Sequence, residues 1–207
     1  MRTMLSLTAA ATLGLALAAT SALADQNAAD SLTYSILRNG LPVGSHTVTV
    51  RPVEGGATAV ETITELAVRS GFSTVYRFQQ TGTEEWKDGR LVAMRNVTND
   101  NGRRIEVSAQ PAGDGLSVSA DGAQAQVVTA QVPASFWNPA VVRQTALLHP
   151  IDGRVLNITA KDMGNDSLLA QGVRHKVRHY RLEGDIQREV WFDASGTLVR
   201  ASETGPD

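Results

Sequence analysis

The sequence predicts an all-β protein: an antiparallel meander of roughly a dozen strands that forms a barrel, a half-barrel or a sandwich. Short segments of alternating apolar and polar residues follow one another, separated by turns that contain glycine. No long helical pattern lies between these segments, which argues against parallel βαβ units. Cysteine is absent, so the core must hold the protein together without disulfides.

The first half of the chain contains most of the expected strands. Asn39-Gly40 is a strong signal for a two-residue hairpin, because both residues tolerate positive φ. Asp88-Gly89, Asn101-Gly102 and Asp121-Gly122 mark later turns in the same way. The expected strands are 31–38, 41–51, 57–70, 74–86, 90–98, 104–110, 116–120 and 123–132.

The alternating pattern stops at Pro133 and resumes only after Pro150. Asn138 is suited to cap a short helix with Pro139 at its first position, so we expect one short helical segment near 138–148. Phe136 and Trp137 precede this segment; two such rings either plug one end of a barrel or form a lid over a cavity. Strands are then expected at 154–161, 168–172, 173–183, 186–193 and 197–202.

The first 24 residues have the pattern of a cleaved secretory signal. Arg2 supplies a positive start, 5–18 is apolar, and Ala22-Leu23-Ala24 places small residues before Asp25. The apolar run is shorter than the roughly 20 residues of a bilayer span. We therefore expect a soluble periplasmic protein that does not span the membrane, with residues 25–207 forming a single β-rich domain.

Composition narrows the function classes. The net charge is −2 and no basic stripe is present, so nucleic acid is a poor partner. The absence of cysteine excludes thiol catalysis and Cys-based metal sites. His175 and His179 would lie roughly 13 Å apart on one strand face, too far to share one metal ion. No serine-nucleophile elbow, phosphate loop or metalloprotease helix is present, so we expect no metal and no cofactor.

Aromatic residues gather on one face of the expected strand 74–86. Tyr76, Phe78 and Trp86 share that face with Glu84, because residues two apart on a strand point the same way. A carboxylate among rings needs a partner, or its pKa rises. Glu84 is either paired with an arginine in an ordinary core, or it is the polar anchor of an apolar ligand pocket.

A Glu-x-Trp pattern occurs twice, at Glu84–Trp86 and at Glu189–Trp191, each followed by a glycine turn and a Leu-Val pair. The pattern indicates either two hairpins that use the same packing solution, or a duplicated half-sheet whose two tryptophans line one cavity. Together with the opening hairpin 34–44, these hairpins resemble exported bacterial β-rich proteins classed only as domains of unknown function. The resemblance implies a β-barrel-like periplasmic domain and transfers no catalytic residue.

These features favour a protein that binds or carries an apolar or amphiphilic small molecule in a β-barrel-like cavity. The candidate ligand-binding residues are Tyr76, Phe78, Glu84, Trp86, Phe136, Trp137 and Trp191. Two alternatives stay open: an envelope hydrolase that uses an inward carboxylate such as Glu84, and a non-enzymatic envelope interaction module. An outer-membrane barrel is disfavoured by the aromatic content of only 5%. The sequence does not identify the ligand or an oligomeric state.

Overall fold

The computed structural model describes residues 29–203 and confirms the all-β prediction, with thirteen strands in two antiparallel sheets. The larger sheet contains β1 (Asp30–Arg38), β2 (Leu41–Val53), β3 (Ala57–Ser70), β4 (Ser73–Lys87), β5 (Arg90–Asp100), β6 (Arg103–Ala112), β7 (Gly115–Ala120) and β8 (Gln126–Val128). The smaller sheet contains β9 (Ala146–Leu148), β10 (Val155–Ala170), β11 (Val173–Gly184), β12 (Arg188–Asp193) and β13 (Leu198–Glu203). The expected signal peptide, 1–24, lies outside the described residues.

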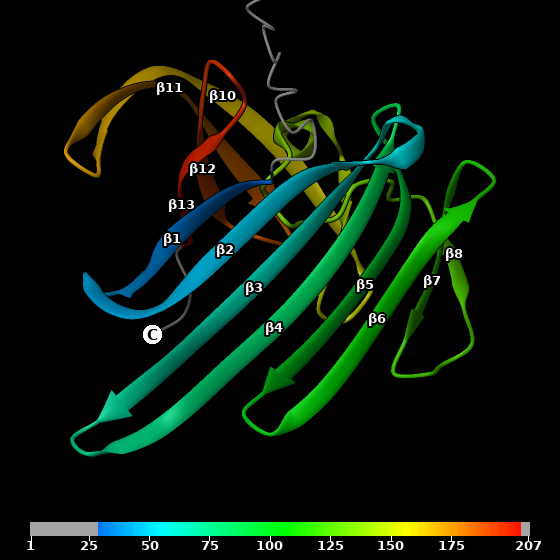
Figure 1. Cartoon of the computed structure of the whole chain (residues 1–207), viewed down its shortest axis with the longest axis horizontal. Coiled ribbons are helices and arrows are strands. Elements are labelled where there is room, and N and C mark those ends of the chain that lie inside the picture. The colour runs from blue at the N-terminus through cyan, green and yellow to red at the C-terminus, as the bar shows by residue number, and fades with distance from the viewer. Residues whose placement is uncertain (1–28, 204–207) are drawn as a thin grey trace, which may run out of the picture.

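The larger sheet is a simple meander, because its spatial order β1 to β8 is also the chain order. The sheet curves strongly into a half-barrel (Figure 1). Its first hairpin turns at Asn39 and Gly40, whose φ angles of 51° and 78° are those of the predicted two-residue turn.

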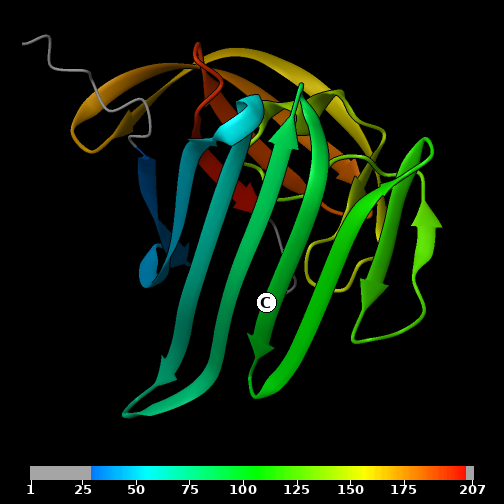
Figure 2. The same cartoon turned by 45° about the vertical axis from the view of Figure 1, so that its right-hand side comes forward.

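The smaller sheet, in the order β13-β12-β11-β10-β9, lies across the concave side of the half-barrel (Figure 2). Here the structure corrects two predicted strands. The segments 154–161 and 168–172 belong to one strand, β10, which continues its pairing with β11 through a bulge between Asp162 and Gly164. The Asp162 carboxylate accepts the Gly164 N–H at 2.9 Å, which stabilises the bulge. In the larger sheet, the expected strand 123–132 is reduced to β8.

The segment that links the two sheets contains the predicted helical turn in a shorter form. It is a 3-10 helix, Pro139–Arg143, and Asn138 caps it by accepting the Ala140 N–H at 2.9 Å. The second half of the predicted helix is instead the strand β9, whose Leu148 exchanges backbone hydrogen bonds with Val132 and Ala134. Helical residues in the described part occur only in 3-10 turns, and none of these helices is long and apolar enough to cross a membrane.

One cluster of buried apolar side chains joins the two sheets. Val60 and Val107 enter it from the larger sheet, and Leu182 and Val190 enter it from the smaller sheet. Leu148 of the linking segment is fully buried between them. The two sheets therefore pack on a shared core, and the space that the core leaves unfilled is the candidate site.

Candidate functional site

A cavity of about 1170 Å³ lies inside the half-barrel and is lined by both sheets. This volume is somewhat above the usual range for small-molecule sites, about 300–1,000 Å³. Its wall includes Phe78 and Gln80 of β4, Phe136 of the linking segment, and Leu198 of β13. The mixed lining offers apolar surface together with hydrogen-bonding groups.

A row of polar side chains crosses the inner face of the larger sheet. Strand pairing aligns Tyr34, His46, Thr64, Gln80 and Thr98 on five successive strands. His46 Nδ1 and Thr64 Oγ1 are hydrogen-bonded at 2.8 Å. The first four of these side chains line the cavity. We call these aligned residues the polar row.

A second aligned set, Thr62, Gly82 and Asn96, lies beside the polar row. A Cβ atom on Gly82 would collide with the side-chain oxygens of Thr62 and Asn96, so only glycine fits between them. Asn96 donates to the Pro150 carbonyl oxygen at 2.9 Å, but its own Oδ1 is buried without a partner among the described residues. Asn96 Oδ1 therefore remains available as an acceptor beside the cavity.

Glu84 has an unusual environment for a carboxylate. It is only 7% exposed, and its Oε2 accepts hydrogen bonds from two indole N–H groups, Trp86 at 2.8 Å and Trp137 at 2.9 Å. The two rings meet edge to face, 5.7 Å apart. Burial raises the pKa of Glu84, while Trp137, Ser135 and Trp86 act in the opposite direction by hydrogen bonding. The Ser135 hydroxyl is buried near the carboxylate but, unlike the two indoles, does not meet hydrogen-bond geometry.

Charged side chains of both signs, Arg188, Arg200 and Glu203, line the cavity from the smaller sheet. Arg188 lies over the Phe136 ring, 4.4 Å from its centre, and forms an ion pair with Glu203. Burial, followed by the charge of Arg188, lowers the pKa of His46, which favours a neutral imidazole. Tyr34 joins the sheets by donating its hydroxyl to the Leu198 carbonyl oxygen at 2.9 Å. A cationic group and several neutral donors and acceptors thus share one wall.

The seven candidate residues from the sequence separate into three groups. Phe78, Glu84 and Phe136 line the cavity. Trp86 and Trp137 bind the Glu84 carboxylate but are not part of the wall. The partner of Glu84 is thus a pair of indoles, and the expected arginine pairing is wrong.

Tyr76 and Trp191 belong to the third group, which lies away from the cavity wall. Tyr76 donates to Asp100 Oδ1 at 2.7 Å, and burial together with this carboxylate raises the pKa of Tyr76 to about 12. Trp191 stacks on His179 with the ring centres 4.3 Å apart and donates to Asp166 at 3.1 Å. Neither Trp86 nor Trp191 lines the cavity, so the predicted pair of tryptophans in one cavity is wrong.

Sequence reasoning missed several cavity residues, above all Tyr34, His46, Thr64 and Arg188. A signal for three of them was present, because they occupy inward positions of alternating strands. A polar residue at an inward position indicates that apolar side chains do not fill the interior there, because a polar group buried among them would need a hydrogen-bond partner. Arg188 had no such signal.

No group of three or more histidine or carboxylate side chains in the range 29–203 is arranged to hold a metal ion. Among the titratable groups on the wall, Tyr34, His46, Arg188 and Glu203 lie near one another, whereas Glu84 lies apart from them. From strand pairing, Glu84 and His46 are two strands and four residues apart, roughly 16 Å between Cα atoms at ~4.8 Å per strand and ~3.3 Å per residue. The geometry is therefore suited to holding a molecule by separate contacts along its length.

An incompletely closed antiparallel barrel around an internal cavity defines a β-barrel-like protein, the class implied by the sequence resemblance. The chain belongs to the family described as a domain of unknown function, DUF6134, whose model matches residues 34–205. It is also similar in structure to a β-barrel-like protein of the domain of unknown function DUF1849 from Brucella abortus. That match has a TM-score of 0.53 at 10% identity and covers 86% of this chain and 96% of the other, so it supports the fold alone. The curated proteins include no match.

Proposed function

We propose that the protein is an exported binding protein that holds an amphiphilic small molecule in its internal cavity. The observation that carries the proposal is the cavity of about 1170 Å³ between the two sheets. A space of this size between two packed sheets is large enough to hold a small molecule. Export to the periplasm rests on the signal-like pattern of residues 1–24.

The lining supports an amphiphile because it combines two kinds of surface. Apolar side chains on the wall include Ile36, Phe78, Phe136, Ile151, Leu156, Ile186 and Leu198. They offer the burial that a hydrocarbon group requires. The polar row and the ion pair between Arg188 and Glu203 offer hydrogen-bonding groups to a polar head group. A wholly apolar ligand would leave the Asn96 Oδ1 acceptor beside the cavity without a partner.

The hydrolase alternative receives less support from the geometry. General acid–base catalysis by Glu84 needs its carboxylate within hydrogen-bond reach of the proton that it transfers. Within residues 29–203, the carboxylate of Glu84 forms no ion pair and is contacted by indoles. Its closest polar neighbours orient and bury it, as expected for a structural or binding role.

Binding of the hydrophobic dye N-phenyl-1-naphthylamine to the purified mature protein tests the proposal. Gln80→Trp places a bulky ring in the cavity, because Gln80 belongs to its wall. We expect dye binding to weaken at least about tenfold, the equivalent of about 1.4 kcal/mol. The control is Thr81→Trp, which puts the same ring on the exposed face of the same strand and should leave binding unchanged.

Equal binding by both variants, or no binding by the wild type, would contradict the proposal. Native mass spectrometry and lipid extraction of the freshly purified protein provide an independent measurement. We expect an amphiphile that co-purifies with the wild type and is depleted in Gln80→Trp. Thermal unfolding of both variants confirms that each remains folded.

A further inference from the structure

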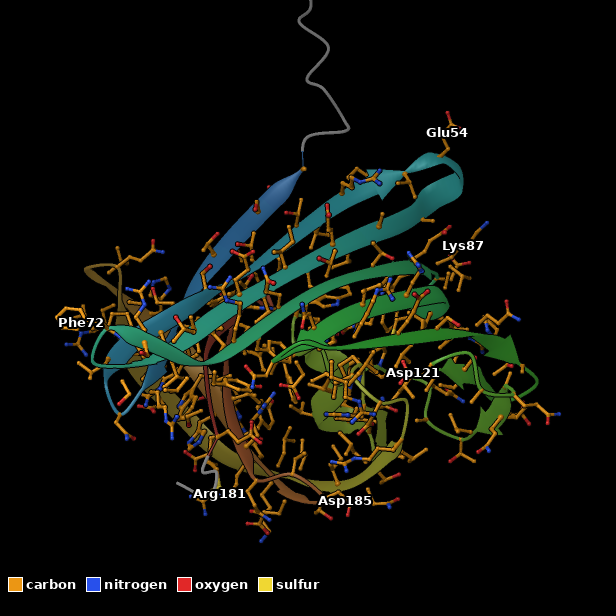
Figure 3. All side chains as sticks on the ribbon, turned by 90° about the horizontal axis from the view of Figure 1, so that it is seen from below. Glu54, Phe72, Lys87, Asp121, Arg181 and Asp185 are labelled. Carbon is orange, nitrogen blue, oxygen red and sulfur yellow. The ribbon has the colours of Figure 1, made fainter. Side chains whose placement is uncertain are left out.

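Three hairpin tips project from one end of the molecule: the turns β1–β2, β3–β4 and β10–β11. They lie on the same side in Figures 1 and 2. In Figure 3, Phe72 of the β3–β4 turn lies opposite Glu54 and Lys87, which belong to turns at the other end. We call the segments 37–41, 68–75 and 168–176 the tip segments.

The tip segments expose large apolar side chains. Six of the ten large hydrophobic side chains that are exposed in the described part belong to them: Leu37, Leu41, Phe72, Val75, Leu169 and Val173. Phe72 is fully exposed at the end of its hairpin, and Leu41 and Leu169 are each 69% exposed. Scattered single apolar residues are ordinary on a protein surface, but this concentration on three tips at one end marks an interaction site.

The same segments carry positive charge. They contain Arg38, Arg69, Arg174 and Lys176 and no acidic residue, whereas the whole chain has a net charge of −2. All four basic side chains are exposed. The nearest acidic neighbour in sequence, Asp166, accepts a hydrogen bond from Trp191. The tip segments themselves are therefore basic; the nearby carboxylate of Asp100, in the adjoining strand β5, accepts the Tyr76 hydroxyl.

The opposite end provides an internal comparison. The β2–β3 turn is Glu54-Gly55-Gly56 and the β4–β5 turn includes Asp88. None of the exposed large hydrophobic residues of the described part belongs to these two turns. These two turns therefore lack the exposed apolar side chains that the tip segments carry.

Two of the three tips also border the cavity. Leu37 and Gly40 of the β1–β2 tip and Ala170 and Gln171 of the β10–β11 tip belong to its lining. A surface bound to these tips would meet the open end of the cavity. The β1–β2 and β10–β11 tips are therefore part of the rim of the candidate ligand-binding cavity.

We propose that the three tips dock the protein on an anionic lipid bilayer, with the open end of the cavity against the membrane surface. Exposed leucine, valine and phenylalanine side chains enter the interfacial region of the bilayer, while arginine and lysine contact lipid phosphates. Docking itself does not require a ligand. Its use in passing an amphiphile between bilayer and cavity rests on the proposed binding function.

A bilayer fits this end better than a second copy of the chain. A symmetric dimer would place the same tips face to face, bringing four basic side chains of each copy together without an acidic partner on the tips. A bilayer with acidic lipids supplies the opposite charge. It is also broad enough to receive all three tips at once.

Vesicle flotation tests the proposal with the purified mature protein. The vesicles contain phosphatidylethanolamine with phosphatidylglycerol, or phosphatidylcholine alone. We expect the wild type to float with the first and to bind the second more weakly by about fivefold for each basic side chain engaged. The triple variant Leu41→Ser, Phe72→Ser and Leu169→Ser should lose most of the binding to both.

A matched control changes three exposed apolar residues outside the tips, Ile63→Ser, Val127→Ser and Met163→Ser, of which Val127 is as exposed as Leu41. The control should float like the wild type. Absence of wild-type flotation, or equal losses in both triple variants, would overturn the proposal. Self-association that depends on the tips and persists without vesicles, measured by sedimentation velocity, would instead indicate a second copy as the partner.

Dye binding in vesicle-free solution separates this proposal from the proposed function. The tip variant should bind N-phenyl-1-naphthylamine as the wild type does, because Leu41, Phe72 and Leu169 are not part of the cavity lining. A protein that binds dye but never vesicles contradicts docking alone. A protein that docks but binds no dye contradicts the binding function alone.

Discussion

Two hairpins of this protein share the pattern Glu-x-Trp and yet use it in opposite ways. In β4, Glu84 is 7% exposed and its carboxylate accepts from Trp86 and Trp137. In β12, the Glu189 side chain is 31% exposed and binds Arg181 at 2.9 Å. The spacing of two residues puts both members of each pair on one strand face. It does not determine whether that face lies in the core or near solvent.

The tryptophans differ in the same way. Trp86 belongs to the main core cluster, whereas Trp191, although equally buried at 5%, lies outside it. Trp191 is flanked by His179 on one side and by Arg200, 5.0 Å from its ring, on the other. Because Trp191 packs on polar side chains, its removal should lose less apolar contact than removal of Trp86 from the core cluster.

The largest expected effect comes from removing the buried ring. Trp86→Ala should lower the free energy of unfolding by about 3–5 kcal/mol, because it leaves a core cavity and also removes a donor from buried Glu84. Trp191→Ala should cost clearly less. Urea denaturation of both variants measures the difference, and equal losses would show that the two hairpins are energetically equivalent.

A smaller and pH-dependent effect is expected for Glu84→Gln. Because burial raises the pKa of Glu84 in the folded protein above its ordinary value of 4.5, ionisation destabilises the fold as the pH rises from about 4.5 through the raised pKa. Glutamine keeps an acceptor for the indoles and does not ionise. The variant should therefore gain stability relative to the wild type as the pH rises through this window.

Unfolding in urea at a series of pH values measures this change. Glu189→Gln, which changes the glutamate of the second Glu-x-Trp pattern, is the matched control. At each pH, the free energy of unfolding of each variant is compared with that of the wild type. If the difference in free energy of unfolding between Glu84→Gln and the wild type stays constant across the window, the pKa of Glu84 does not change on folding.

The smallest expected effect is that of Glu189→Gln at neutral pH. The ion pair between Glu189 and Arg181 has both side chains substantially exposed, at 31% and 44%. Exposed ion pairs contribute about 0.2–1 kcal/mol and are weakened by salt. Chemical denaturation with and without added sodium chloride should show a small loss that shrinks with salt. If Glu189→Gln lowered the free energy of unfolding as much as Trp86→Ala does, the two hairpins would not differ in their contribution to stability.

The strand pattern and the turns could be predicted from sequence because both depend on neighbours along the chain. Asn39-Gly40 specified a hairpin by the φ angles that these residues tolerate, and Asn138 capped a helical turn through its own side chain. The continuation of β10 through Gly164 could not be predicted, because its pairing with β11 supplies the hydrogen bonds that maintain a strand across a polar segment. The strand β9 depends in the same way on distant backbone partners.

The candidate site was only partly predictable for a related reason. Alternation along β4 correctly placed Phe78 and Glu84 on the inner face. It gave no information about what lies opposite, so the indole of Trp137 replaced the expected arginine as the partner of Glu84. Trp191 was assigned to the cavity because it repeats the pattern of Trp86, but it lies on a different sheet among different neighbours.

The amino-acid sequence alone determined that this protein is all-β, where most strands begin and end, and which residues share a strand face, because these properties follow from local φ preferences and a side-chain period of two. Only the tertiary structure decided how the half-barrel receives the smaller sheet, which polar residues align across five strands, and which hairpin tips gather at the cavity's open end. Those features arise from hydrogen bonds and packing between residues far apart in the chain, whose partners no local pattern specifies.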